Sequence, residues 1–270
     1  MNDVKRYFQR PGTVARWWNP EDERDPHFAH FREQLTWVVG QVDWEGRQVL
    51  DVGTGKGRFA IPFARQGARV MAMDISGEML VEARQRAQQA GLPAAAQAGV
   101  VPCFVQGDAE RLPFPSHSFD VVSCMEALMH VPHPQQAVAE AARVVRPGGQ
   151  TVFSMTNKWR INALANLPVA LARLLRLNRS PAGTQIAWYH STRTFKGWLQ
   201  RAGLKIRHLR GQGLFQSGAR LAFTRRFSVP LFPVAFADWF FARVEPPLRE
   251  SPLLHVMGTM MAIAVAEDES

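Results

Sequence analysis

Residues 49–60 read VLDVGTGKGRFA, in which an apolar strand runs through an acid into three glycines on alternate positions. Such glycines let the backbone turn sharply into a helix and approach a ligand closely. The stretch lacks the GxxxxGK followed by Ser or Thr that a nucleotide-phosphate loop needs. It also lacks the last glycine of a dinucleotide turn, because Arg58 stands there. The acid at the strand end, Asp51, would repel a pyrophosphate and favours a ligand that carries an amino group.

Two later strands also lead into acids. The run VMAMD ends at Asp74, where a carboxylate can accept hydrogen bonds from both hydroxyls of a ribose. The third strand leads into Gly107-Asp108-Ala109, where an acid can accept from an adenine amine. S-adenosylmethionine (SAM) has an amino group, a ribose and an adenine. The acids at 51, 74 and 108 together therefore predict SAM as the cofactor.

Apolar runs alternate with helical patterns through the first half of the chain. We expect strands near 48–52, 69–73, 101–106, 119–124 and 149–155, and helices near 27–42, 57–66, 77–90 and 134–145. Further along we expect helices at 160–179 and 191–202 and strands at 204–210 and 259–266. The alternation predicts an α/β fold with a parallel sheet covered by helices on both faces.

As a set, these motifs resemble the class I SAM-dependent methyltransferases from about residue 47 to 155. The resemblance implies a doubly wound, mostly parallel sheet with strand order 3-2-1-4-5-7-6, an antiparallel last strand and helical cap insertions. We expect the cofactor to be bound by Asp51, Gly53, Gly55, Gly57, Asp74, Ile75, Asp108, Ala109 and Met125.

A narrower resemblance covers roughly residues 15–210. The segments ARWWNPEDERDPHFAHF, CMEALMHVP, SMTNKWRINALA and PAGTQIAWYHS are similar to segments of the ubiquinone-pathway O-methyltransferases. The resemblance implies methylation of a phenolic or catecholic oxygen on a prenylated ring at the membrane surface. The chain departs from that family at Met129, where a second acid is usual, and at residues 212–257, which separate its last two expected strands.

Candidate catalytic groups follow the fourth strand. Glu126 and His130 are four residues apart, and on a helical turn they would share one face. His130 could act as a general base toward a phenol, or pack and cap the turn before Pro132. The resemblance suggests that Glu126 and His130 could instead hold a divalent ion. The missing acid at 129 disfavours a tight metal site, so we expect none.

Other residues are candidates for the acceptor site. Trp17, His190 and Arg193 are assigned to substrate binding, although the sequence favours His190 as a residue that precedes a helix start at Ser191. The remaining histidines are expected on the surface or in loops; they are His27, His30, His117, His133, His208 and His255.

Composition limits the class of protein. The 270 residues are 46% hydrophobic and 20% charged, which is typical of a globular domain with a real core. We expect no signal peptide and no membrane-spanning helix. The two cysteines, Cys103 and Cys124, fall in expected strands and are assigned to the core, which fits a cytoplasmic location.

Charge is distributed unevenly along the chain. Residues 151–270 contain 16 Lys and Arg against 6 Asp and Glu, whereas residues 1–150 are nearly balanced. The segments 160–179 and 225–243 place Arg beside Leu, Phe or Trp, which suits either a cap over an apolar substrate or peripheral contact with an anionic inner membrane surface. The partner is expected to be a small aromatic acceptor. Alternatives are an RNA methyltransferase, a C-methyltransferase of a quinone or natural product, and a non-catalytic SAM-binding regulator.

These features divide the chain into four parts. We expect a helical arm or lid at 1–46, a SAM-binding core at 47–156 and a basic amphipathic cap at 157–190. The remainder of the sheet is expected in 191–270, interrupted by the insertion at 212–257.

Overall fold

The computed structural model describes residues 3–10, 12, 28–92, 102–159, 187–214, 220–222, 228–230 and 233–267. The expected helix at 160–179 and the candidate residue Trp17 lie outside these ranges. Among the helices in these ranges, none combines the length and apolar character that crossing a bilayer requires.

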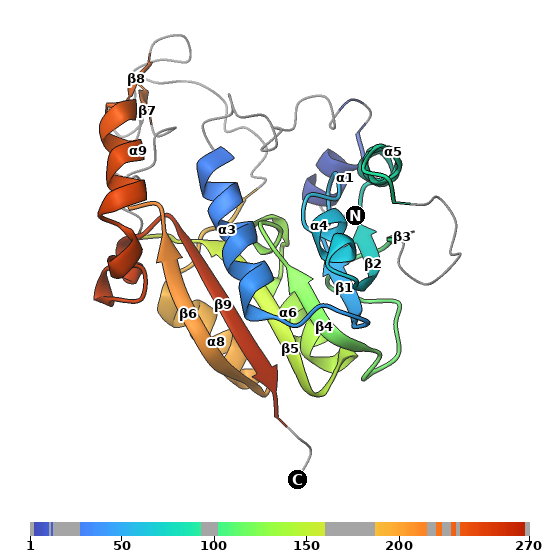
Figure 1. Cartoon of the computed structure of the whole chain (residues 1–270). Coiled ribbons are helices and arrows are strands. Elements are labelled where there is room, and N and C mark those ends of the chain that lie inside the picture. The colour runs from blue at the N-terminus through green and yellow to red at the C-terminus, as the bar shows by residue number, and fades with distance from the viewer. Residues whose placement is uncertain are drawn as a thin grey trace.

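Seven strands form one sheet in the order β3-β2-β1-β4-β5-β9-β6 (Figure 1). They are β1 (Gln48–Val52), β2 (Arg69–Asp74), β3 (Cys103–Gln106), β4 (Phe119–Cys124), β5 (Val145–Thr156), β6 (Leu204–Gln212) and β9 (Thr259–Ala266). β9 runs antiparallel to β5 and β6, and the other neighbours pair in parallel. Because β9 is the seventh strand of this sheet along the chain, the expected order 3-2-1-4-5-7-6 is confirmed.

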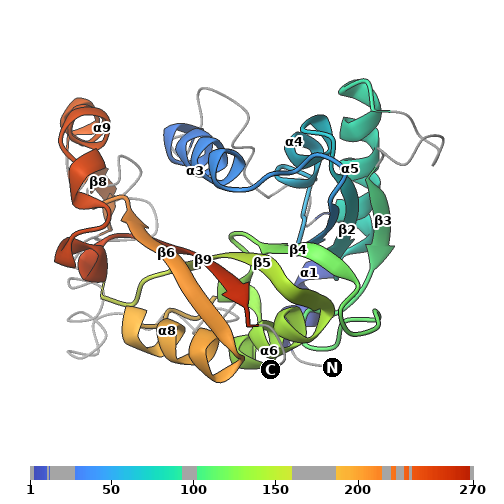
Figure 2. The same cartoon turned by 60° about the horizontal axis from the view of Figure 1, so that its bottom comes forward.

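Helices cover both faces of the sheet (Figure 2). One face carries α3 (Phe28–Gln41), α4 (Ala60–Arg65) and α5 (Gly77–Gln89), and the other carries α6 (Pro134–Val144) and α8 (Thr192–Arg201). In β1, Val49 packs in the core cluster of α3 and α4, whereas Leu50 packs in that of α6 and α8. Successive residues of a strand point to opposite faces, so an unbroken apolar strand supplies both cores. The doubly wound architecture is confirmed.

The glycine loop delays the first core helix. α4 begins at Ala60 and not at the expected residue 57. Gly53, Gly55 and Gly57 have φ values of 71°, 55° and 80°, in the left-handed region that a right-handed helix excludes. The loop therefore extends past its last glycine before the helix starts.

β5 is longer than expected. It begins at Val145 and runs through the expected Pro147-Gly148-Gly149 turn. Its pairing with β4 shifts register between Phe119 and Val121. A Cβ at Gly149 would lie 2.8 Å from the Asp120 carbonyl oxygen, so the glycine lets the two backbones approach at this irregularity.

Two expectations about burial were wrong. Cys103 is exposed, because β3 is an edge strand, while Cys124 in the central β4 is buried as expected. His30 is buried rather than at the surface, and its ring centroid lies 4.2 Å from that of Phe241. It belongs to the inner stripe of α3, which repeats at helical spacing through Gln34 and Val38.

An insertion connects β6 to β9. Its described elements are β7 (Arg220–Ala222), β8 (Ser228–Pro230), α9 (Val234–Arg243) and the 3₁₀ turns Pro246–Leu248 and Pro252–Val256. The hairpin β7–β8 lies at the far end of α9 from the sheet (Figure 1).

A buried ionic network fixes the base of this insertion. Glu245 is fully buried and accepts hydrogen bonds from the backbone N–H groups of Gly213 and Leu214 at 2.9 and 2.8 Å. Arg249 and Arg210 both pair with Glu33 of α3, at 2.9 and 2.5 Å. Charge pairs that are also hydrogen-bonded hold their partners in one geometry, so α3, β6 and the insertion are joined at this point.

Candidate active site

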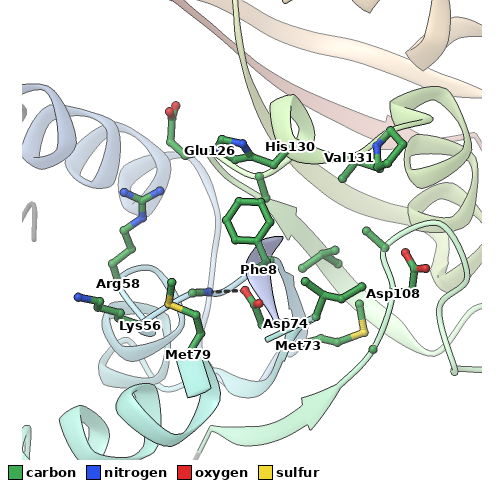
Figure 3. Close-up of a pocket in the computed structure, with 18 of the residues that line it drawn as sticks. Phe8, Lys56, Arg58, Met73, Asp74, Met79, Asp108, Glu126, His130 and Val131 are labelled. Carbon is green, nitrogen blue, oxygen red and sulfur yellow. Dashed lines mark hydrogen bonds between the residues drawn. The ribbon is translucent and has the colours of Figure 1, made fainter. Parts of the chain in front are cut away.

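A cleft opens at the carboxyl edge of β1, β2, β3 and β4 (Figure 3). Most of the predicted site residues line it: Gly53, Gly55, Asp74, Ile75, Asp108, Ala109, Glu126 and His130. Open parallel sheets bind their ligands at this edge. The sequence motifs therefore converge in space, although they are spread over four strand ends.

The glycine loop forms one wall of the cleft. Its N–H groups at Gly53 and Thr54 both donate to the Met73 carbonyl oxygen, at 2.8 and 3.0 Å, which fixes the loop against β2. A Cβ at Gly55 would have no atom within 4 Å, so this glycine faces open space. Gly57 does not line the cleft; it is buried, and a Cβ there would lie 3.1 Å from the Ile61 Cδ1.

Asp74 is held in a fixed orientation at the end of β2. Its Oδ2 accepts from the Gly55 N–H and its Oδ1 accepts from the Ser76 N–H, each at 2.8 Å. Burial raises the pKa of Asp74, and the backbone hydrogen bonds from Ser76 and Gly55 oppose that rise. A carboxylate positioned in this way presents its remaining lone pairs to the cleft, as the predicted ribose contact requires.

Asp51 lies beside the cleft but is not part of its lining. It is buried, and its Oδ2 has no hydrogen-bond partner. Burial raises the pKa of Asp51 to about 6, while the nearby hydroxyls of Thr54 and Ser123 and the charge of Arg58 act in the opposite direction. A buried carboxylate oxygen without a partner is costly, so this site favours a positively charged ligand.

Asp108 lies on the other side of the cleft from the glycine loop (Figure 3). Its Oδ1 accepts from the Glu110 N–H at 3.0 Å, which fixes the turn after β3. Ala109 and Ile75 line the same cleft. The contact of Asp108 with an adenine stays a prediction, which their position in the cleft allows.

Glu126 is held by a contact that the sequence did not predict. It has a φ of 55°, which is uncommon for a residue other than glycine. Its Oε1 accepts from the Ser154 hydroxyl at 2.9 Å and from the Gln34 amide at 3.2 Å. The Ser154 Oγ in turn accepts from the Glu126 N–H at 2.6 Å.

His130 also lines the cleft, but the helical spacing predicted for it was wrong. A 3₁₀ turn covers only Leu128–His130, and Glu126 lies outside it in the left-handed region. The two side chains nevertheless line the same cleft (Figure 3). The His130 ring meets the Phe8 ring edge-on, with centroids 5.3 Å apart.

The N-terminal arm closes one side of the cleft. Phe8 ends α1 (Asp3–Phe8) and lines the cleft. The Gln9 amide donates to the Ile75 carbonyl oxygen at 3.4 Å, and the Gly12 N–H donates to the Glu78 carboxylate at 3.2 Å. The sequence predicted an arm here but not the place of Phe8 in the cleft; the aromatic pair Tyr7-Phe8 in a polar segment was the available signal.

Three cations line the cleft and were also missed: Lys56, Arg58 and Arg86. The first two lie within the quoted glycine stretch itself. The Arg86 Nε donates to Glu82 at 2.8 Å, in an ion pair along α5.

Several predicted site residues do not line the cleft. Met125 is buried in the core against α3 and α4. His190 lies edge-on to Trp198, with centroids 4.7 Å apart, and Ser191 caps α8, which agrees with the alternative assignment. Burial, and secondarily the charge of Lys158, lowers the pKa of His190. Arg193 is exposed in the first turn of α8.

The donor set suits SAM. The ammonium group of SAM matches the buried Asp51, and its ribose matches the oriented Asp74. The cofactor also needs the open space beside Gly55.

No three His, Cys, Asp or Glu side chains come together as a metal site within the described ranges. Met129 is buried, and its Sδ accepts from the Thr156 hydroxyl at 3.2 Å.

Comparison with known proteins agrees with this geometry. Residues 50–153 match the family model described as a methyltransferase domain. The ubiquinone biosynthesis O-methyltransferase of Photorhabdus laumondii is 33% identical over 205 residues, covering 73% of this chain and 79% of that protein. The protein of the same name from Paracidovorax citrulli is 39% identical over 169 residues, covering 63% and 67%.

Solved structures share the fold. The magnesium protoporphyrin IX methyltransferase of Synechocystis PCC 6803 with bound S-adenosylhomocysteine (SAH) superposes with a TM-score of 0.62 at 20% identity, over 98% of this chain and 99% of that one. The [4+2]-cyclase SpnF gives 0.62 at 19% identity, over 99% and 96%. Together with the curated relatives, the family model and the cleft geometry, they establish that the chain belongs to the class I SAM-dependent methyltransferases.

Proposed function

We propose that this enzyme transfers the methyl group of SAM to a phenolic or catecholic oxygen of a prenylated aromatic acceptor. The observation that supports it best is the placement of Glu126 and His130 on the wall of the cofactor cleft, just after β4. The curated relatives named ubiquinone biosynthesis O-methyltransferase support the same acceptor class.

The chain's own residues provide positioning and proton transfer. SAM supplies an electrophilic methyl group on a sulfonium, so the enzyme mainly has to align the acceptor oxygen with it. In the proposed mechanism His130 accepts the phenol proton, a contribution of typically ~10²–10⁴-fold. Glu126, fixed by Ser154 and Gln34, orients the acceptor hydroxyl. Phe8 covers His130 and excludes water from this side.

The direct test is product identification. Purified protein is incubated with isotopically labelled SAM and a prenylated catechol, and the product is analysed by mass spectrometry and NMR. An O-methyl product that is lost in His130→Gln, with SAH binding retained, supports the proposal. A ring C-methyl product would place the enzyme among C-methyltransferases, and transfer only to RNA would contradict the acceptor class.

We also propose peripheral contact with an anionic membrane through α9. Phe236 and Trp239 are 40% and 56% exposed on this helix, which ends at Arg243. Exposed aromatic side chains combined with basic residues are typical of interfacial helices. The excess of Lys and Arg in residues 151–270 complements anionic headgroups.

A further inference from the structure

Arg58 directly follows the last glycine of the loop and lines the cofactor cleft. Its guanidinium carbon lies 5.7 Å from the Phe59 ring centroid and 6.0 Å from that of Phe31. Both rings are buried, so the long side chain rests on rigid apolar surfaces. Figure 3 shows Arg58 rising along the wall toward Glu126, on the side opposite Asp108.

Opposite charges lie close together at this end of the cleft. The buried Asp51 carboxylate interacts electrostatically with Arg58. Asp108, predicted to contact adenine, lies on the far side of the cleft (Figure 3). A ligand that places its adenine near Asp108 therefore presents its amino-acid end, which carries one ammonium and one carboxylate, to the pair Asp51 and Arg58.

We propose that the Arg58 guanidinium binds the carboxylate at the amino-acid end of SAM, while the Asp51 carboxylate faces its ammonium group. A guanidinium presents a planar fork of N–H donors that matches a carboxylate, which an ammonium cannot reproduce. The rings of Phe31 and Phe59, which meet edge-on with centroids 5.4 Å apart, reduce the side-chain freedom of Arg58 that binding must remove. The proposal concerns the cofactor alone and is independent of the acceptor.

A competing role for Arg58 is packing. By lying over Phe31 of α3 and Phe59 of the loop, the guanidinium could simply hold α3 against the cleft wall. Its removal would then weaken every cofactor analogue by a similar factor. Removal of a carboxylate contact would instead weaken only the ligands that carry a carboxylate.

The experiment compares a ligand that carries the carboxylate with an analogue that lacks it. Calorimetry measures SAH and its decarboxylated analogue against wild type, Arg58→Met and Arg58→Lys, with circular dichroism and melting curves confirming the fold of each. We expect wild type to prefer SAH by ~10- to 100-fold, the range of a charge-assisted pair. Arg58→Met should lose most of that preference while binding the decarboxylated analogue within about threefold of wild type. Arg58→Lys should fall between the two.

Lys56→Met is the matched control, because it removes the same charge from the same loop. We expect it to keep the preference for SAH. Equal weakening of both ligands in Arg58→Met would overturn the proposal in favour of packing. An undiminished preference in Arg58→Met, or its loss in Lys56→Met instead, would also overturn it.

Discussion

Gly53 and Ala127 are packed so closely that a Cβ at position 53 would lie 2.4 Å from the Ala127 Cβ. This contact joins the loop after β1 to the turn after β4. The first supplies the cofactor wall, and the second supplies Glu126 and His130. The position of the proposed catalytic groups relative to the cofactor cleft therefore depends on the absence of one methyl group.

Gly53→Ala should disrupt both sides of the cleft. Its φ of 71° already disfavours a side chain, and the added Cβ cannot be accommodated without moving backbone. We expect the free energy of unfolding to fall by ~2–4 kcal/mol and SAH binding to be lost, as measured by denaturant melts and calorimetry. Gly55→Ala is the control: its Cβ meets open space, so it should cost only ~1 kcal/mol of stability yet still impair SAH binding. Equal stability losses in the two variants would contradict this account.

Asp74 is expected to contribute to the affinity for the cofactor more than to the stability of the fold. In Asp74→Asn one carboxylate oxygen becomes an N–H₂ group, which cannot accept both the backbone and ribose hydrogen bonds. We expect SAH affinity to fall ~10- to 100-fold. The control is Asp120→Asn at the opposite end of the sheet, which removes the charge that pairs with Arg146 and leaves one oxygen to accept from either Arg146 or the Gln48 N–H. It should lower the melting temperature and leave SAH affinity unchanged.

Asp51 should make the ligand-free protein sensitive to pH. Its pKa is about 6 in the folded state against an ordinary 3.8, because burial disfavours the charged form. The protonated Asp51 therefore makes its full contribution to folding stability below pH 3.8, and this contribution is lost as the pH rises through 6. Above pH 7 the buried charge then costs about 3 kcal/mol. Asp51→Asn should therefore stabilise the ligand-free protein at pH 7.5, with a gain that shrinks toward pH 4.5, and should weaken SAH binding at pH 7.5.

Melting temperatures across this pH range test the point, with Asp238→Asn as a control at an exposed acid of α9. That variant should show no comparable gain. A lower melting temperature for Asp51→Asn at pH 7.5 would mean that the charge is already compensated without ligand.

Ser154 is expected to act through Glu126. Ser154→Ala removes the hydroxyl that fixes both the Glu126 carboxylate and its N–H. We expect kcat to fall by ~10-fold with SAH affinity unchanged. Thr151→Val in the same strand loses a buried bond to the Ala264 carbonyl oxygen, away from the cleft. It should affect stability only, and a parallel loss of SAH affinity in Ser154→Ala would argue for a general structural role.

The aromatic face of α9 can be tested on vesicles. The double variant Phe236→Ser and Trp239→Ser should pellet at least ~5-fold less with anionic liposomes at low salt, because the apolar anchor is removed. Val81→Ser serves as the control, since Val81 is 54% exposed on α5, outside α9. Wild type that stays in the supernatant at low salt would remove the membrane proposal.

The sequence predicted the features that depend on residues adjacent in the chain, such as strand ends and helix starts. The strand order was implied by the resemblance to the class I SAM-dependent methyltransferases. The parallel sheet with helices on both faces followed from the βαβ alternation, and the acids at 51, 74 and 108 marked three strand ends. Each of these signals is local, because a strand end and its polar residue are adjacent in the chain. Helix starts such as Ser191 before α8 followed in the same way from capping chemistry.

What the sequence did not predict depends on contacts between distant segments. Glu126 was placed on a helix because nothing in CMEALMH shows that Ser154 would hold it at a φ of 55°. Phe8 and Arg58 lacked a motif, although both line the cleft. His30 was expected at the surface because the residue that covers it, Phe241, lies far along the chain.

The pairing of Gln212 with Thr259 has a consequence for how such enzymes diversify. The chain leaves the sheet at one of these residues and returns at the other, directly across the ladder. A segment inserted between these two residues is a loop whose ends are already adjacent. The entropic cost of closing such a loop grows only slowly with its length. The segment between them can therefore be exchanged without changing the sheet, provided that Glu245 and Arg249, which join the insertion to β6 and α3, are kept.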